Sequence, residues 1–582
     1  MINPAIFRAY DIRGNSHKDL SPKTAYKIGF CFAKIIISGQ SAKEPNHICV
    51  GRDGRLSSEE FCNALLQGIK AAGAKVKYIG LVATPTLYFA DKIFSASGSI
   101  MVTGSHNPKD DNGFKMLKDN APFFGAMIQD LKNHLEEFNW ENIEIKKDHK
   151  EEIIDVKEDY INRILLNSKI RKNLKIAFDP ANGSGGELTS ILCSKLSCQT
   201  FMINEKIDGN FPAHDPDPTI AKNLHQLKEY VLKNNCDIGI GFDGDADRIG
   251  VVTKKGNFVP GDQLLCLYAK DVINKTPNAK IIADVKASGS LFDYIEKIGG
   301  IPIMWKTGHS FIKAKMKETG AKLAGEMSGH IFFADEYYGY DDGLYAAVRL
   351  IDIISNSSES IDDMIEKLPK VYNTPEIKLA VSDETKFVII DDIKASIREQ
   401  NIDFIDIDGL RVNSKYGWWL LRASNTGPAL IVRFDALVPI NISLGATSTS
   451  NFQVSATVAS SCTVAASTVA FGNYTLAQLD GTSTITATCT NGTIYTIGLS
   501  AGTFSGATTT TRRMTGPSAS GLSYSLYFDS GRTANWGNVT GSWVSGTGTG
   551  TAQNLTVYGR IPASQSALIG SYSDTVTVTI TF

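Results

Sequence analysis

The stretch Thr103–Pro108, with the sequence TGSHNP, places a serine on a turn directly after the apolar run Ile100–Val102. An apolar run followed by Gly, Asn and Pro is typical of a buried strand that ends in a tight turn. Ser105 is therefore expected at the end of a strand, and Lys115 is close enough in sequence to fold back beside it as a cation. Taken alone, this segment would be an ordinary surface turn. The remaining motifs of the chain indicate a function for it.

The second motif is the acidic run DGDADR at residues 243–248, which follows the strand-like run 236–242. Its three carboxylates stand at alternate positions: Asp243, Asp245 and Asp247. Side chains spaced in this way can gather on one side of the backbone and supply the hard oxygen ligands that Mg²⁺ prefers. A calcium loop of the EF-hand type would need Gly in place of Arg248 and Glu in place of Lys254, which excludes it. The alternatives are a metal site suited to phosphoryl transfer and a solvated acidic turn.

Further polar loops carry groups that bind sugar hydroxyls or anions. Residues 325–330 (GEMSGH) offer a carboxylate, a hydroxyl and an imidazole, which suit vicinal sugar hydroxyls. Residues 422–428 (RASNTGP) offer a guanidinium, hydroxyls, an amide and backbone N–H groups, which suit an anion. Residues 307–309 (TGH) and 7–14 (FRAYDIRG) add a histidine and arginines. Each loop alone would be a solvated turn, and only their order along one chain indicates a common site.

With its motifs in this order, the chain resembles the α-D-phosphohexomutase family, and in particular its bacterial phosphomannomutase/phosphoglucomutase branch, from Met1 to about Ala436. Alternating apolar strands and amphipathic stretches fit an α/β architecture of that kind. The expected segments are 1–151, 152–257, 258–370 and 371–436, with the catalytic cleft where they meet. The last segment is predicted to be truncated, because the family pattern continues beyond the strand 429–435, whereas here a β-rich tail begins.

The resemblance implies a role for each motif. The expected catalytic residues are Ser105 as the phosphoserine and Arg13, Lys115 and His330, the last three being alternatives for the general acid/base. The expected ligands of Mg²⁺ are Ser105, Asp243, Asp245 and Asp247. The residues expected to bind the substrate are Tyr10, Arg248, Lys286, Thr307, Gly308, His309, Glu326, Ser328, Arg422, Ser424, Asn425 and Thr426.

The resemblance also implies a reaction, the interconversion of hexose 1-phosphate and hexose 6-phosphate, with mannose, glucose or both as the sugar. Ser105 would give its phosphoryl group to a hexose monophosphate, and the resulting 1,6-bisphosphate would reorient and return its other phosphate. Glucose 1,6-bisphosphate or an equivalent is the expected primer. A phosphoserine carries about −1.5 to −2 charges at pH 7, which Mg²⁺, Arg13 and Lys115 would offset. A mobile loop at 422–428 would bind the distal phosphate in both orientations.

The composition changes towards the C-terminus. No glutamate follows Glu399 and no lysine follows Lys415, and from Asn441 onward Ser, Thr, Gly and Ala dominate. Runs of period two, such as Ser573–Phe582 and Ser483–Cys489, indicate the strands of an all-β sandwich. The low charge suits a secreted or assembled domain.

Residues 447–582 resemble the spore coat protein U domain family, which includes subunits of archaic chaperone–usher pili. The matching positions are Phe452–Val458, Cys462, Phe471–Gly472, Cys489, Leu526–Asp529, Arg532, Trp536–Gly537 and Tyr558–Ile561. The resemblance implies an immunoglobulin-like sandwich that a strand of another pilin-like subunit or a chaperone completes. Residues 452–458 are either that donor strand or an internal strand, and 437–446 are a linker or a second candidate donor strand. Cys462 and Cys489 would form a disulfide in an oxidising compartment.

Charge and hydropathy narrow the classes of function further. A formal net charge of −2 does not favour nucleic-acid binding, and no apolar run is long enough to span a bilayer. No signal peptide precedes Phe7, so a cytoplasmic mutase part is expected, whereas the tail is of a type that is normally periplasmic or extracellular. The chain is interpreted as a fusion with two possible functions. It is a phosphohexomutase, or it is a secreted pilus or coat subunit with an inactive mutase-like passenger.

Overall fold

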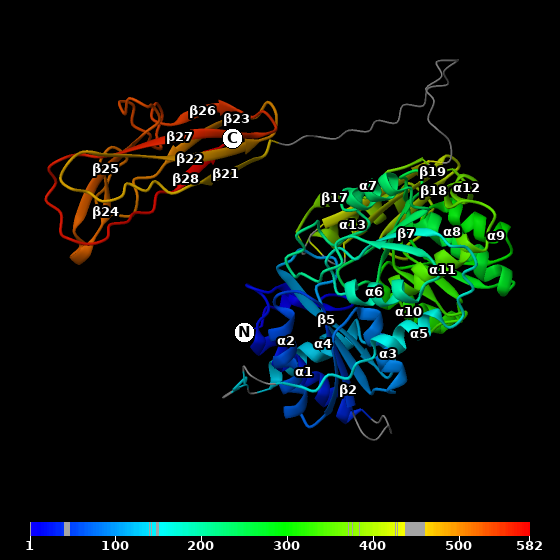
Figure 1. Ribbon diagram of the computed structural model, residues 1–582. Coiled ribbons are helices and arrows are strands. Elements are labelled where there is room, and N and C mark those ends of the chain that lie inside the picture. The colour runs from blue at the N-terminus through cyan, green and yellow to red at the C-terminus, as the bar shows by residue number, and fades with distance from the viewer. Residues whose placement is uncertain are drawn as a thin grey trace, which may run out of the picture. The chain divides into compact units, whose positions relative to one another are not determined.

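The computed structural model describes residues 2–39, 47–138, 140, 143–146, 150–370, 372–374, 376–382, 385–424, 427, 429–436 and 460–582. The chain divides into two compact units, Met1–Ile442 and Ser443–Phe582 (Figure 1). In the described residues, no helix is both long and apolar enough to cross a membrane.

The first sheet of the N-terminal unit carries the serine motif. Its strands, in the order β1-β5-β4-β2-β3 with β6 beside β5, are β1 (Ile12–Asn15), β2 (His47–Arg52), β3 (Lys75–Leu81), β4 (Gly98–Val102), β5 (Asp111–Lys118) and β6 (Ala121–Pro122). The helices are α1 (Pro22–Ser38), α2 (Ser58–Ala71), α3 (Thr84–Ile93) and α4 (Ala126–Glu137). All five residues of β4 are buried, so the strand delivers Ser105 to the end of a fixed central element.

The second sheet carries the acidic motif. Its strands, in the order β11-β10-β9-β7-β8, are β7 (Lys175–Asp179), β8 (Gln199–Met202), β9 (Ile238–Phe242), β10 (Ile249–Thr253) and β11 (Phe258–Val259). Its helices are α5 (Lys157–Leu165), α6 (Gly186–Lys195) and α7 (His225–Asn234). β9 and β10 are antiparallel neighbours, and Asp243–Arg248 is the connection between them.

The third sheet carries the proposed sugar-binding loops. Its strands, in the order β13-β12-β14-β15, are β12 (Lys280–Asp284), β13 (Ile301–Trp305), β14 (Leu323–Gly325) and β15 (Ile331–Phe333). The helices are α8 (Gly261–Lys275), α9 (Gly289–Lys297), α10 (His309–Thr319), α11 (Gly343–Ser355) and α12 (Ile361–Glu366). The loop of Thr307 leaves β13, and the loop of Glu326 joins β14 to β15.

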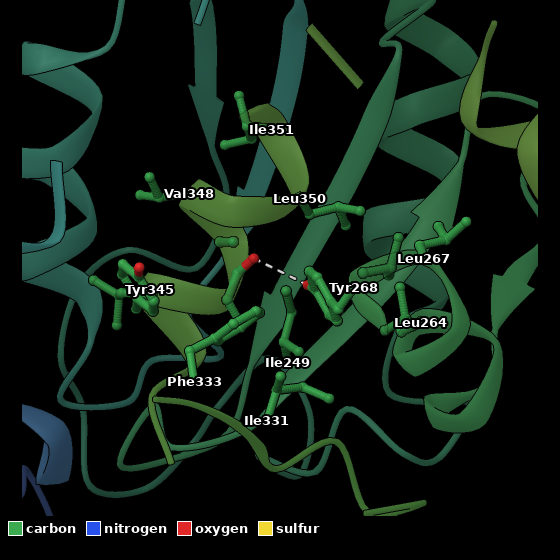
Figure 2. Close-up of a cluster of buried hydrophobic side chains, with 14 of the residues drawn as sticks. Ile249, Leu264, Leu267, Tyr268, Ile331, Phe333, Tyr345, Val348, Leu350 and Ile351 are labelled. Carbon is green, nitrogen blue, oxygen red and sulfur yellow. Dashed lines mark hydrogen bonds between the residues drawn. The ribbon is translucent and has the colours of Figure 1, made fainter. Parts of the chain in front are cut away.

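The second and third sheets share one hydrophobic core. Ile249 of β10 packs in the same buried cluster as Ile331 and Phe333 of β15 (Figure 2). The hydroxyl of Tyr268 in α8 donates a hydrogen bond of 2.9 Å to the carbonyl oxygen of Ala346 in α11. Each such side chain contributes about 1.5–3 kcal/mol when fully buried. Because successive side chains of a strand point to opposite faces, the polar residues directly before Ile249 and Ile331, Arg248 and His330, face the other way, toward the site.

The fourth sheet is entirely antiparallel in its described strands. These are β16 (Tyr372–Asn373), β17 (Ile377–Ala380), β18 (Leu410–Ser414), β19 (Gly417–Ala423) and β20 (Ala429–Ala436), with helix α13 (Lys386–Glu399). The helix covers one face through Ile390, which packs with Leu421 and Leu430. On the same face, Phe434 stays 46% exposed and Leu379 47% exposed, so the helix covers only part of it.

The C-terminal unit consists of strands in its described regular structure, apart from one short 3₁₀ turn, Pro517–Ala519. One sheet has the order β21-β22-β27-β25-β24 and the other β26-β23-β28. The strands are β21 (Cys462–Ala466), β22 (Leu479–Cys489), β23 (Ile494–Leu499), β24 (Arg512–Thr515), β25 (Gly521–Tyr527), β26 (Val544–Thr547), β27 (Ala552–Ile561) and β28 (Val578–Thr581). The predicted β-rich fold is confirmed, and its immunoglobulin-like character stays a prediction. The candidate donor strands 438–444 and 452–458 lie outside the described residues.

A disulfide joins Cys462 of β21 to Cys489 of β22, which face each other in the strand register. The seven cysteines of the N-terminal unit are free.

We expect reduction of this disulfide to destabilise only the C-terminal unit. The bridge closes a loop of 27 residues, and a loop of this size corresponds to about 3 kcal/mol of stability. Calorimetry of the full chain should show one transition that falls by about 10 °C when a reductant is added, while the other does not move. A variant with Ser at both Cys462 and Cys489 should melt at the lower temperature with or without reductant. If the midpoint temperatures of both transitions stay unchanged when the reductant is added, this expectation is wrong.

Candidate active site

A cavity of about 710 Å³ opens in the N-terminal unit and is lined by residues from all four of its sheet regions. Most residues predicted to bind substrate line it, together with two of the predicted catalytic residues: Tyr10, Arg13, Arg248, Lys286, Thr307, Gly308, His309, Glu326, Ser328, His330, Arg422 and Ser424. Ser105, Lys115 and the three aspartates are buried and are not among the lining residues. Asn425 and Thr426 lie outside the described residues.

Ser105 is held in an uncommon backbone conformation. Its φ angle is +51°, in the left-handed region that residues other than glycine rarely adopt. The buried guanidinium of Arg55 donates 2.7 Å to the carbonyl oxygen of Ser105, and the hydroxyl of Thr103 accepts the Ser105 N–H at 2.9 Å. A side chain at Gly104 would come within 2.5 Å of Arg55 Nε, so this position requires glycine. Strain of this kind costs about 1–3 kcal/mol and is typical of functional positions.

The hydroxyl of Ser105 lies against the acidic loop. It donates 3.0 Å to Asp243 Oδ2, and its other neighbour is His106, whose Nδ1 lies 3.3 Å away. All three aspartates of the loop are fully buried, and one oxygen of each lies within 4.8 Å of the others. The structure therefore brings the two sequence motifs, which are 138 residues apart, into direct contact.

Lys115 of β5 offsets part of the negative charge of the acidic loop. Its Nζ donates 2.7 Å to Asp245 Oδ2 and also donates to Asp247. Although burial opposes the effect, the ammonium of Lys115 holds the pKa of Asp245 well below its usual range. Burial and the charges of Asp247 and Asp245 raise the pKa of Asp243 well above its usual range. Lys115 thus pairs with two of the three carboxylates, and Arg248 Nε lies 3.9 Å from the third, Asp243.

The acidic loop fits a hard divalent cation. Asp245 Oδ1 and Asp247 Oδ1 are buried and have no hydrogen-bond partner in the described part of the chain. A buried carboxylate oxygen without a partner is costly, and a bound cation would remove that cost. Together with Asp243, these residues supply oxygen ligands only, which suits Mg²⁺ or a similar ion.

Two arginines approach the Ser105 loop from different sheets. Arg13 of β1 is held by Asp11, which accepts its Nε–H at 2.6 Å, and its NH1 donates 3.2 Å to Asn107. Arg248 follows the acidic loop, and its NH2 lies 3.4 Å from His106 Nε2. Both guanidinium groups therefore reach the TGSHNP motif, where they are suited to bind a phosphate.

The loops that carry Thr307 and Arg422 are connected by a residue that the sequence did not indicate. Asp408 accepts the backbone N–H of Thr307 at 3.0 Å and Arg422 Nε at 3.0 Å. Glu326 accepts the backbone N–H of Gly308. Lys286 donates 2.7 Å to Glu376, a second residue missing from the prediction.

Sequence reasoning missed several polar residues at this site: His106, Asp217, Glu376, Lys378, Asp408 and Arg433. His106 carries a signal, because it is part of the TGSHNP motif and directly follows Ser105. The other five stand in no motif. They come to the site through the pairing of strands and the packing of loops that are distant in sequence.

Comparison with known proteins shows the family. The descriptions "Phosphoglucomutase/phosphomannomutase, alpha/beta/alpha domain I", "domain II" and "domain III" match residues 4–155, 158–256 and 260–372, and the "C-terminal domain" matches 376–437. "Spore Coat Protein U domain" matches residues 448–579. The chain belongs to the phosphoglucomutase/phosphomannomutase family and carries a further domain of the spore coat type.

Several relatives are similar over nearly their whole length. The phosphomannomutase/phosphoglucomutase of Pseudomonas syringae pv. tomato is 42% identical over 431 residues, which are 74% of this chain and 91% of that protein. A phosphoglucomutase of Neisseria meningitidis is 42% identical over 433 residues, 74% of this chain and 93% of its own. A phosphoglucomutase/phosphomannomutase family structure from Burkholderia thailandensis is 40% identical, with a TM-score of 0.68. The match covers 75% of this chain and 94% of that structure's chain. The predicted family, the α/β mutase fold with a β-rich C-terminal region, and the type of reaction are confirmed. The alternative, a secreted pilus or coat subunit with an inactive mutase-like passenger, is not favoured.

We expect the acidic loop to bind a divalent cation through its full set of carboxylates. Replacing Asp243→Asn removes one ligand charge, which should weaken binding of Mn²⁺, used as a probe, by about tenfold or more. Titration calorimetry near neutral pH measures this. The matched control is Asp179→Asn, which changes another buried carboxylate of the same sheet, one that accepts from His214 at 2.9 Å. Equal affinity in wild type and Asp243→Asn would show that the loop is not the cation site.

Proposed function

We propose that this chain interconverts hexose 1-phosphate and hexose 6-phosphate through a phosphorylated Ser105, with mannose, glucose or both as the sugar. The observation that carries the proposal is the contact of 3.0 Å between Ser105 Oγ and the buried Asp243. It joins a strained nucleophile to a cation-binding cluster, beside a cavity lined by the sugar and phosphate loops. The relatives named above are phosphomannomutases and phosphoglucomutases, which supports the same reaction.

The proposed site residues are those predicted from the sequence. Asp243, Asp245 and Asp247, with the phosphorylated Ser105, would hold Mg²⁺, which supplies positive charge beside the phosphoryl group when bound. Arg13 and Lys115 stabilise the negative charge of the group during transfer. The proposal includes the predicted domain limits, which are 1–151, 152–257, 258–370, 371–436, 437–446 and 447–582.

Proton transfer to and from the sugar hydroxyl needs a group that can exist in both protonation states near neutral pH. Although burial opposes it, Asp245 and Asp247 raise the pKa of Lys115 above its usual value. Asp11 does the same for the pKa of Arg13. Both side chains therefore stay cationic, which suits charge stabilisation rather than proton transfer. The remaining predicted candidate is His330, which lines the cavity; its Nε2 accepts from Arg248 Nε at 3.1 Å, so it would serve the sugar hydroxyl only by exchanging that contact.

The distal part of the cavity suits the second phosphate of the substrate. Lys286, Arg422 and Ser424 line it and present two cations and a hydroxyl. Asn425 and Thr426, outside the described residues, belong to the same proposed phosphate loop. A 1,6-bisphosphate that turns round within the cavity would present either phosphate to these groups, so glucose 1,6-bisphosphate or an equivalent would act as the primer. Glu326 and Ser328, which also line the cavity, would bind sugar hydroxyls.

For the C-terminal unit we propose strand exchange with another pilin-like subunit or a chaperone. The supporting observation is that its core includes apolar side chains that stay only partly buried, among them Val464, Phe471, Val578 and Ile580. A strand added from a neighbour would cover them. The mutase reaction uses sugar phosphates, so the N-terminal unit is proposed to work in the cytoplasm, although the tail belongs to a type that is normally periplasmic or extracellular.

We expect Ser105→Ala to abolish mutase turnover, by about 10⁴-fold or more, because it removes the group that carries the phosphoryl. The assay uses glucose 1-phosphate and mannose 1-phosphate with Mg²⁺ and catalytic glucose 1,6-bisphosphate. The control is Ser99→Ala, which changes another buried serine near the start of β4, one that donates 2.6 Å to Asp91. It should keep turnover close to that of wild type. Turnover that survives in Ser105→Ala would exclude the phosphoserine mechanism.

A further inference from the structure

Asp341 is a fully buried carboxylate that lies behind the cavity and is not one of its lining residues. It stands on the connection between β15 and α11. Its Oδ2 lies 3.2 Å from His330 Nδ1 and 3.9 Å from His309 Nδ1, and both histidines line the cavity. Its Oδ1 accepts 2.8 Å from Lys313 Nζ. The carboxylate thus connects two histidines of the site to the buried ammonium group of Lys313.

Strand pairing brings this residue to the site. Arg248 and His330 face each other in an isolated antiparallel bridge, and Phe332 and Asp341 form a second one. Ile249, Ile331 and Phe333, which alternate with these residues, point into the hydrophobic cluster of Figure 2. Because strand residues alternate between faces, Arg248 and His330 lie together on the opposite face. Asp341, which faces Phe332 in the second bridge, lies on that same face, one strand pair farther along.

Two contacts define which nitrogen of His330 carries the proton. Arg248 Nε donates 3.1 Å to His330 Nε2, and an arginine N–H can only donate, so Nε2 must carry a lone pair. The proton of the neutral ring is therefore on Nδ1, which faces Asp341. Asp247 Oδ1 is the other acceptor near Nδ1, but it lies farther away, at 3.5 Å, and belongs to the cation site. Neither Nδ1 nor Asp341 Oδ2 makes a hydrogen bond in the described residues, and the two buried atoms lie 3.2 Å apart, close enough to pair with each other.

We propose that Asp341 is a positioning residue that holds His330 in the Nδ1–H tautomer, so that Nε2 can orient the guanidinium of Arg248. The inference rests on the proposed mutase function, whose site it deepens. Arg248 NH2 lies 3.4 Å from His106 Nε2, and His106 Nδ1 lies 3.3 Å from Ser105 Oγ. Asp341 therefore acts on the phosphoserine loop through a chain of contacts, without touching substrate. Partners of this kind commonly set ring orientation and tautomer.

Lys313 keeps Asp341 ionised for this role. Although burial opposes ionisation, the ammonium of Lys313 holds the pKa of Asp341 well below its usual range. Lys313 itself donates 3.2 Å to the hydroxyl of Tyr88 in α3. The positioning residue in the third sheet region is thereby connected to the first sheet region, which carries Ser105.

The neighbouring Asp342 provides a matched control, because it is equally buried but faces the other way. Its carboxylate accepts 2.8 Å from the Tyr160 hydroxyl and 2.9 Å from the Tyr337 hydroxyl, and it caps the N-terminus of α11. Burial raises the pKa of Asp342 to about 7. An asparagine there resembles its protonated form, so Asp342→Asn should leave the fold and the site intact.

The test is Asp341→Asn in the full chain. Lys313 can donate only to the amide oxygen, so the amide NH₂ turns to His330 Nδ1 and donates to it. The ring then takes its proton on Nε2, against Arg248 Nε–H. We expect kcat to fall about 10- to 100-fold with KM within about threefold of wild type, whereas Asp342→Asn changes neither.

The tautomer is measured independently of activity, from the ¹⁵N chemical shifts of the histidine rings at one pH. The His330 signals are identified by their loss in His330→Gln. The expected result is Nδ1–H in wild type and in Asp342→Asn, and Nε2–H in Asp341→Asn. Asp341→Glu, which keeps the charge, should restore the Nδ1–H tautomer and part of kcat.

The outcomes separate the two proposals. Wild type without mutase turnover would overturn the proposed function, while the ring shifts still decide the tautomer. An Nε2–H tautomer in wild type would overturn the role of Asp341, and this holds even if Asp341→Asn does not fold. Unchanged kcat in a folded Asp341→Asn would overturn it as well. Equal losses of kcat in Asp341→Asn and Asp342→Asn would show a structural role only.

Discussion

The N-terminal unit is organised around the burial of three carboxylates beside one serine. Asp243, Asp245 and Asp247 are fully removed from water, and buried charges without partners are strongly destabilising. Part of their counter-charge comes from another sheet, because Lys115 of β5 reaches Asp245 and Asp247. Removing one partner of such a buried ion pair typically lowers the stability of a protein by about 3–5 kcal/mol. The requirement to neutralise this charge therefore holds the first two α/β regions in one arrangement and also prepares the site for a cation and a phosphate.

Apolar packing and polar chemistry occupy opposite faces of the same short strands. Ile331 and Phe333 anchor β15 in the core shared by the second and third sheets (Figure 2), while His330, the residue before β15, lines the cavity. The fourth sheet attaches through both kinds of contact: Trp418 and Leu420 pack against Val285 of the third region, and Arg411 donates 2.7 Å to the carbonyl oxygen of Val285.

The two units use different means of stabilisation. In the N-terminal unit, the hydrophobic core of the second and third sheets is extensive and the seven cysteines are free. The C-terminal unit has few charged residues, a core around Trp536 and one disulfide. A small β-sheet unit gains much from a covalent link between neighbouring strands, whereas a large α/β unit has enough buried apolar surface without one.

The sequence by itself determined the family, the two-part organisation and the residues of the motifs, because each of these is a local pattern. A strand followed by TGSHNP or DGDADR places Ser105 and Asp243 at strand ends without knowledge of the fold. The distance between them, the left-handed backbone of Ser105 and the roles of Asp341 and Asp408 were decided only by the tertiary structure. These depend on strand register and on loops brought together from distant parts of the chain. Adjacent aspartates such as Asp341 and Asp342 look alike in the sequence, and only the packing around each one separates a positioning residue from a helix cap.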